Sequence, residues 1–161
     1  MLKLSLLNHY EYNEFENGYY FLTDSGNKYI ITFIKYPLCS DELPMDVFMF
    51  NIDRTDEGNH KNGDKQLVRN TIANILMNFF KYNENAIITV CDIYDDRQLC
   101  RKRLFDGWYE QLGKDYIKKV DATIDIEGTQ TYANLFYAYT NSHIDELIKG
   151  FNALANENFY N

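Results

Sequence analysis

The most strand-like run of the chain is AIITVC at residues 86–91, and DIYDDRQLCRKRLFDGWYEQL at 92–112 follows it directly. The first run is short, continuously apolar and rich in β-branched residues, which is typical of a strand covered on both faces. We therefore expect it at the centre of a sheet. In the second run, Asp95 can cap a helix that ends near Gly113, with Gln98 placed to complete a capping box.

The residues before this strand predict a β-meander followed by a helix. Strands are expected at 10–15, 19–23 and 28–36, where aromatic and polar residues lie between Asn- and Gly-bearing turns. A fourth strand is expected at 46–51, and its nearly continuous apolar character indicates that both of its faces are covered. A helix is expected from Asp64 to about Tyr82, with an apolar stripe on one face. Three asparagines share its opposite side: Asn70, Asn74 and Asn78. We interpret that asparagine stripe as a solvated surface rather than a binding face.

The residues after 113 complete the expected architecture. A strand at 116–127 alternates apolar with acidic residues, and another is expected at 131–140. Ser142 can cap a last amphipathic helix. The sequence thus predicts a single α+β domain over residues 1–161, with a mixed sheet of about seven strands and three packed helices.

Composition limits the classes of function. The 161 residues are 45% hydrophobic and 16% aromatic, which excludes disorder for most of the chain. The net charge of −8 makes nucleic acid an unexpected partner and disfavours an anionic membrane. No segment has the pattern of a membrane span or signal peptide, and the three cysteines fit a reduced cytoplasmic protein.

Two arginines make residues 92–112 the expected location of any site. At about 100° per residue, Arg97 and Arg101 fall inside the apolar sector of the predicted helix, beside Trp108. Four other polar side chains fall on the far side of that helix: Lys102, Arg103, Asp106 and Glu110. A buried guanidinium needs a partner, such as Asp92 or Asp95. We prefer a structural ion-pair cluster, with a binding site at the end of the strand as the alternative.

Other chemistries are weakly supported. Cys91 and Arg97 have the C-x5-R spacing of cysteine phosphatases, but the residues between them include three aspartates and no glycine, which make a poor phosphate nest. Asp92, Asp95 and Asp96 could hold Mg²⁺ or Ca²⁺, yet helix capping accounts for two of them. We predict no catalytic residue, metal or cofactor.

A resemblance accompanies these features. The chain resembles an uncharacterised family of small bacterial proteins of unknown function, over about residues 10–112. The residues that carry the resemblance are Cys91-Asp92, Asp95, Arg97-Gln98, Arg101, Phe105 and Trp108, preceded by Tyr19-Tyr20-Phe21 and Gly26. It implies that Arg97, Arg101 and Trp108 are defining features of the family, and it implies no activity.

The sequence leaves enzyme activity open. We interpret the chain as a non-enzymatic intracellular interaction or regulatory module whose partner is another protein or itself, because its acidic, tyrosine-rich composition suits protein contacts. The alternative is a small enzyme or binding protein that holds an anionic metabolite with Arg97 and Arg101.

Overall fold

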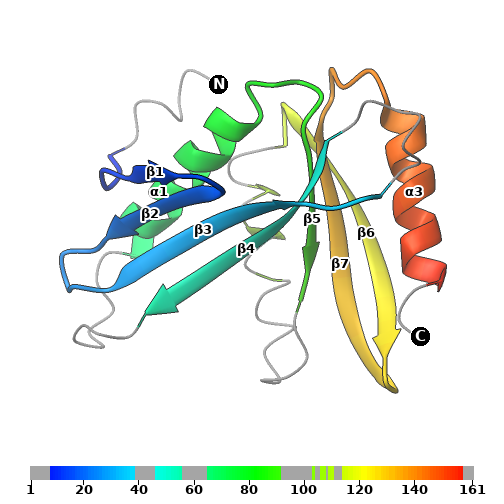
Figure 1. Cartoon of the computed structure of the whole chain (residues 1–161), viewed down its shortest axis with the longest axis horizontal. Coiled ribbons are helices and arrows are strands. Elements are labelled where there is room, and N and C mark those ends of the chain that lie inside the picture. The colour runs from blue at the N-terminus through cyan, green and yellow to red at the C-terminus, as the bar shows by residue number, and fades with distance from the viewer. Residues whose placement is uncertain are drawn as a thin grey trace. The chain divides into compact units, whose positions relative to one another are not determined.

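The computed structural model describes residues 8–38, 46–55, 65–91, 103, 106–107, 109–110 and 114–157. The elements in these ranges are β1 (Asn13–Phe15), β2 (Gly18–Leu22), β3 (Lys28–Lys35), β4 (Val47–Thr55), α1 (Lys65–Phe79), β5 (Ala86–Val90), β6 (Ile117–Ile126), β7 (Thr129–Ala138) and α3 (Ile144–Glu157) (Figure 1). The α+β class is therefore confirmed. The prediction of three helices needs correction, because the described residues form two; the helix expected over Asp95–Gly113 falls mainly outside them.

Seven strands form one mixed sheet in the order β1-β2-β3-β4-β5-β7-β6. The β4–β5 pair is parallel, with Val47 opposite Ala86, whereas β5 and β6 each pair antiparallel with β7. Parallel neighbours need a crossover connection, and the chain between β4 and β5 contains α1. The central position predicted for residues 87–90 is confirmed, because β5 lies between β4 and β7 with Ile87 and Ile88 buried.

The chain divides into two compact units. The first contains Met1–Ile34 and Phe50–Lys81, and the second contains Lys35–Met49 and Tyr82–Asn161.

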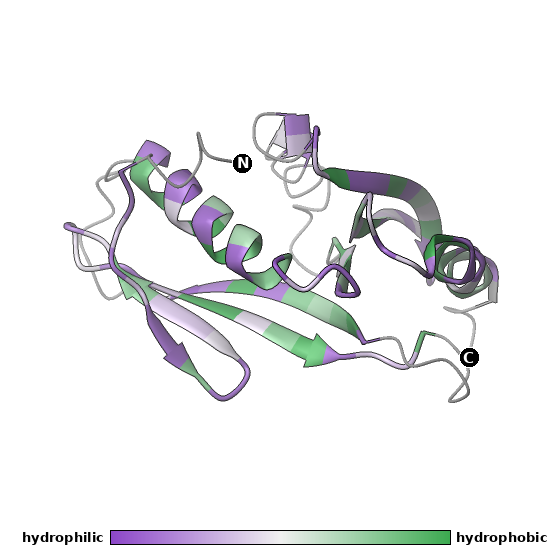
Figure 2. Cartoon of the chain, turned by 90° about the horizontal axis from the view of Figure 1, so that it is seen from above, coloured by the Kyte–Doolittle hydropathy of each residue, from purple (hydrophilic) through white to green (hydrophobic). Residues whose placement is uncertain are grey.

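In the first unit, α1 covers one face of the meander strands (Figure 2). The Phe79 ring of α1 stacks on Phe33 of β3 with 4.3 Å between ring centroids. On the same face of the strands, Phe21 and Ile31 are fully buried, and Phe21 stacks on Tyr29. We call this the inner meander face, and its alternation with exposed side chains follows from the period of two along a strand.

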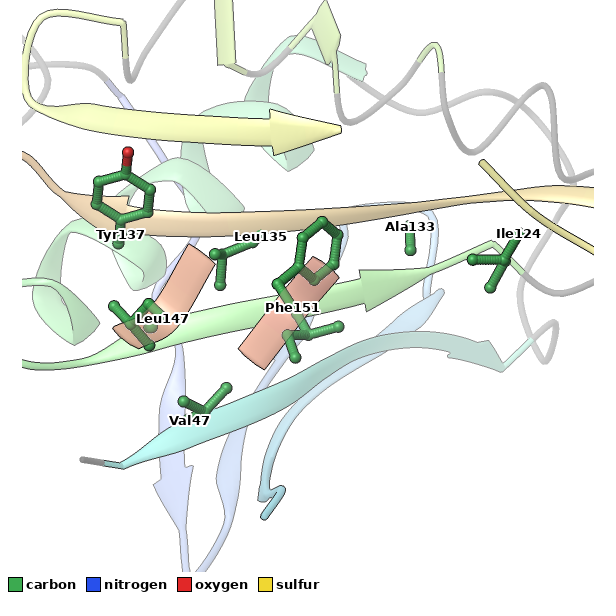
Figure 3. Close-up of a cluster of buried hydrophobic side chains, with 9 residues drawn as sticks. Val47, Ile124, Ala133, Leu135, Tyr137, Leu147 and Phe151 are labelled. Atoms are coloured by element: carbon green, nitrogen blue, oxygen red, sulfur yellow. The ribbon is translucent and has the colours of Figure 1, made fainter. Parts of the chain in front are cut away.

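The core of the second unit lies between α3 and one face of β5, β7 and β6. Phe151 and Leu147 of α3 are fully buried there against Leu135 of β7 (Figure 3). The alternation predicted for residues 116–127 is confirmed, since Val120 and Ala122 pack against this cluster and Ile124 belongs to it. These apolar contacts fix which face of β6 is covered.

The start of α3 differs from the prediction. Ser142 does not cap the helix through its hydroxyl, which instead donates to Glu84 Oε1 at 2.7 Å. The side chain of Asn141 accepts the backbone N–H of His143, and the first helical bond runs from Leu147 N–H to the His143 carbonyl. The cap therefore comes from the neighbouring amide, because the Ser142 hydroxyl is already bound to the carboxylate of Glu84.

Candidate functional site

The five residues predicted to form a site lie outside the described residues: Asp92, Asp95, Arg97, Arg101 and Trp108. The structure does describe Cys91, the residue that directly precedes them. Its backbone N–H donates to the Tyr132 carbonyl at 2.9 Å, and its carbonyl accepts the Thr131 hydroxyl. The Cys91 thiol is fully buried, which disfavours a nucleophilic role because an attacking thiolate must be accessible.

A polar pair lies within the sheet of the second unit, next to this strand end. Asn134 of β7 stands opposite Thr89 of β5, and its Nδ2 donates to the Thr89 hydroxyl at 3.0 Å. Both side chains are buried, and the Asn134 Oδ1 has no hydrogen-bond partner among the described residues. Asp121 of β6 stands opposite Asn134 on the other side, so one polar row crosses three strands.

A lysine with two carboxylate partners lies one row further along the same face. Lys119 Nζ is 2.5 Å from Asp106 Oδ1 and 3.3 Å from Asp121 Oδ1, and its side chain is 12% exposed. The same ammonium lies 5.1 Å from the centroid of the Tyr109 ring, whose other neighbour is Phe136. Asp106 therefore contacts the sheet through Lys119. The apolar residues that defined the predicted far side of the helix lie outside the described residues.

The charge of Lys119 is stabilised by these partners. Burial alone lowers the pKa of this amine, but the hydrogen bond to Asp106 and the charges of Asp121 and Asp106 outweigh it. The net result is a pKa above the ordinary value of 10.5. Two anions neutralise one cation here, so the arrangement suits a structural tie between residues 106–109 and β6 better than it suits an anion-binding site.

Replacing Lys119 by methionine is expected to lower the free energy of unfolding by about 2 kcal/mol at neutral pH, because a similar volume is kept while Asp106 loses its partner. A group with a raised folded-state pKa contributes stability below its unfolded pKa and loses it as the pH rises through the folded value. Urea unfolding of both proteins should therefore show the difference shrinking above about pH 10.5. Lys118→Met, on an exposed side chain, is the control and should change little.

In the first unit, the asparagine stripe of α1 binds the N-terminal segment. Asn70 Nδ2 donates to the Asn8 carbonyl at 2.8 Å, and the Tyr12 hydroxyl donates to Asn74 Oδ1 at 2.6 Å. Asn78 donates to the same Tyr12 oxygen, and burial raises the Tyr12 pKa. The expectation of a purely solvated surface was wrong, because amides at every fourth position can bond a chain that runs along the helix.

The opposite face of the meander strands is apolar and exposed. We call it the outer meander face, and its large side chains are Phe15, Tyr20, Leu22, Ile30 and Ile34, with Thr32 between them. Leu22 is 58% exposed, Ile34 46% and Phe15 39%. Figure 2 shows α1 on the inner side of these strands and no described helix or strand of this unit against the outer side. A solvated sheet face usually carries polar side chains, so the gathering of large exposed apolar side chains on this face is unusual.

Acidic side chains lie in the turns at the two ends of β2. Glu16 and Asp24 are exposed in these turns, whereas Glu14 of β1 stands opposite Tyr19 and so lies on the inner meander face. Lys28 lies on the face itself, where its ammonium stacks on the Tyr20 ring at 4.7 Å from the centroid. The rim is therefore mainly negative, while the centre is apolar and aromatic.

The described residues contain no cluster of three or more His, Cys, Asp or Glu side chains placed to bind a metal ion. Neither α1 nor α3 has the length and apolar content that a membrane-spanning helix requires.

The geometry defines an α+β protein built on one mixed sheet, with a buried Thr89–Asn134 pair and an exposed apolar sheet face. The chain belongs to a family of unknown function (DUF6169), which matches residues 64–153. No curated protein and no solved structure matches it. The resemblance to an uncharacterised family is confirmed, although the match includes β6, β7 and most of α3 and does not include the meander strands.

The outer meander face was missed because its signal is faint. Phe15, Leu22 and Ile34 sit on the same face as Asn13 and Lys28, so the face does not appear as one apolar run in the sequence. In β2 and β3, apolar residues occupy consecutive positions instead of alternating with polar ones. Phe21, for example, is buried on the inner face, whereas the next residue, Leu22, is exposed on the outer face. Apolar residues at both odd and even strand positions make both faces of the meander apolar. Because a single helix covers only one of these faces, the other remains exposed.

Proposed function

We propose that this chain is a protein-interaction module that binds its partner through the outer meander face. The observation that carries the proposal is the exposure of Phe15, Leu22 and Ile34 on a sheet face that α1 does not cover. Large apolar side chains exposed on one face favour association, since burying them removes about 25 cal/mol per Å² of unfavourable hydration.

The charges of the rim specify the partner's chemistry. Glu16 and Asp24 favour a protein surface whose apolar centre is flanked by lysine or arginine, because complementary charge accelerates encounter and excludes acidic competitors. A second copy of this face would place like charges together at its rim. The partner is therefore a different, basic protein.

The alternative is binding of an anionic metabolite by Arg97 and Arg101, which lie outside the described residues. The nearly buried cation that the structure does describe, Lys119, is matched by Asp106 and Asp121. That match favours the interaction module.

A synthetic strand of alternating leucine and lysine tests the proposal. It presents an apolar face with basic flanks, so it should bind the chain, whereas a strand of alternating leucine and glutamate should not. Leu22→Thr combined with Ile34→Thr should weaken binding about tenfold, because threonine keeps the strand propensity and removes apolar area. Fluorescence anisotropy of the labelled peptide gives the dissociation constants.

The control is Tyr82→Ser, which removes a side chain that is 74% exposed in the second unit. Its affinity should equal that of the parent chain. Equal affinity in the Leu22/Ile34 variant, or equal binding of the acidic peptide, would contradict the proposal.

A further inference from the structure

β6 and β1 are the two edge strands of the sheet. β6 has ten residues, whereas β1 has three. Within the described ranges, β6 pairs only with β7. A long strand edge presents a row of N–H and C=O groups that can pair with another strand. The sequence of β6 determines which strand fits it.

The hydrogen bonds to β7 show which backbone groups face outward. Tyr139 N–H donates to the Tyr116 carbonyl at 3.0 Å, and the β6–β7 register places these two residues opposite each other. Hydrogen-bonded pairs recur at every second residue of an antiparallel ladder. Even-numbered residues of β6 therefore bond β7, while odd-numbered residues from Ile117 to Asp125 direct their backbone groups to the edge.

We propose that this edge joins a second copy of the chain, with two β6 strands antiparallel and centred on Ala122. In that register Lys119 stands opposite Asp125 of the partner subunit, and Asp121 stands opposite the partner's Thr123. The Lys119 ammonium already contacts Asp106 and Asp121 of its own chain, so the partner's Asp125 would join this ion-pair cluster rather than form a separate pair. Opposite charges directly across a ladder stabilise pairing. Centring on Ala122 also places the odd-numbered residues of one β6 opposite odd-numbered residues of the other. Their outward-facing N–H and C=O groups can therefore bond each other.

Two other alignments are less favourable. Centring the pair on Asp121 would place that carboxylate opposite the partner's Asp121, and like charges directly opposite destabilise a sheet. A parallel alignment would place lysine beside lysine. On the side that faces α3, the proposed register sets Val120 opposite the partner's Ile124, which extends an apolar row already packed on the core.

The proposed pairing is selective. Lys119 is the basic group and Asp121 and Asp125 are the acidic groups whose side chains share the face of the outward residues. A strand carrying only acids or only bases would meet a like charge at one end of the edge. The antiparallel copy meets opposite charge at both ends.

Cross-linking at the centre tests the register. Residue 122 would face the partner's residue 122 in a pair without ladder hydrogen bonds, where Cα atoms lie about 4.5 Å apart, a distance a disulfide can span. Ala122→Cys, made with Cys39→Ser and Cys100→Ser, should form a covalent dimer on mild oxidation. Lys118→Cys in the same background is the control, because it lies about 26 Å from its counterpart in this register.

Sedimentation of the unmodified full chain under reducing conditions gives an independent measure. We expect a concentration-dependent dimer that Asp125→Lys weakens at least about tenfold. Asp125→Asn keeps the side-chain oxygen that accepts the Gly128 N–H and should have a smaller effect. Leu22→Thr should leave the dimer intact, which separates this edge from the outer meander face.

Two results would overturn the proposal. One is a parent chain that stays monomeric over the whole concentration range. The other is a dimer in which Ala122→Cys cross-links no faster than Lys118→Cys, which would assign association to another surface or register.

Discussion

Replacing Phe151 by alanine is expected to lower the free energy of unfolding by about 3–5 kcal/mol. Phe151 is fully buried in the core of the second unit, among Val47, Leu135 and Leu147 (Figure 3). Its removal leaves a cavity between α3 and the sheet, which the strands cannot close without breaking their register. An ordinary domain has only about 5–15 kcal/mol of stability in total.

Urea unfolding followed by circular dichroism measures this loss. The matched control is Asn152→Ala, the next residue of α3, whose side chain is exposed. It should change the free energy of unfolding by less than about 0.5 kcal/mol. A Phe151→Ala protein as stable as its control would show that α3 is not part of the core.

Replacing Gly18 by alanine is the second change with a large expected effect. Gly18 begins β2 opposite Thr32, and an added Cβ would lie 1.9 Å from the carbonyl oxygen of Ile31. That oxygen is backbone, so it cannot move aside without distorting the β2–β3 ladder. We expect a loss of at least about 3 kcal/mol.

The matched control for this substitution is Gly107→Ala. An added Cβ at Gly107 meets no atom of the described residues within 4 Å, and the residue has helical backbone geometry. The control should be neutral or stabilising by up to about 1 kcal/mol, since alanine favours a helix more than glycine does. Equal melting temperatures for the two variants would contradict the close approach of β2 and β3.

Local patterns predicted the strands and helices well. The alternation around Val120 and Ile124 gave the buried face of β6, and the continuous apolar run gave the central position of β5. Both predictions succeed because side-chain periodicity depends on which face is covered, and this information is local. The strand expected at 10–15 is shorter in the structure, where Tyr10 and Tyr12 bond α1 residues instead of a neighbouring strand.

Long-range pairings could not be predicted from one sequence. Lys119 and Asp106 are thirteen residues apart, and the Tyr12 hydroxyl bonds an asparagine on a helix that starts beyond β4. No periodicity links such partners, because their proximity depends on how separate elements pack. The outer meander face could not be predicted for the same reason, since its exposure depends on which side of the strands α1 covers.

Amide chemical-shift mapping by NMR during titration with the alternating leucine–lysine strand tests the proposed function most directly. We expect the perturbations to concentrate at Phe15, Tyr20, Leu22, Ile30 and Ile34, with small changes around Cys91 and Asn134. Perturbations centred on the end of β5, with the meander amides unchanged, would contradict the interaction surface and support a site next to Arg97 and Arg101.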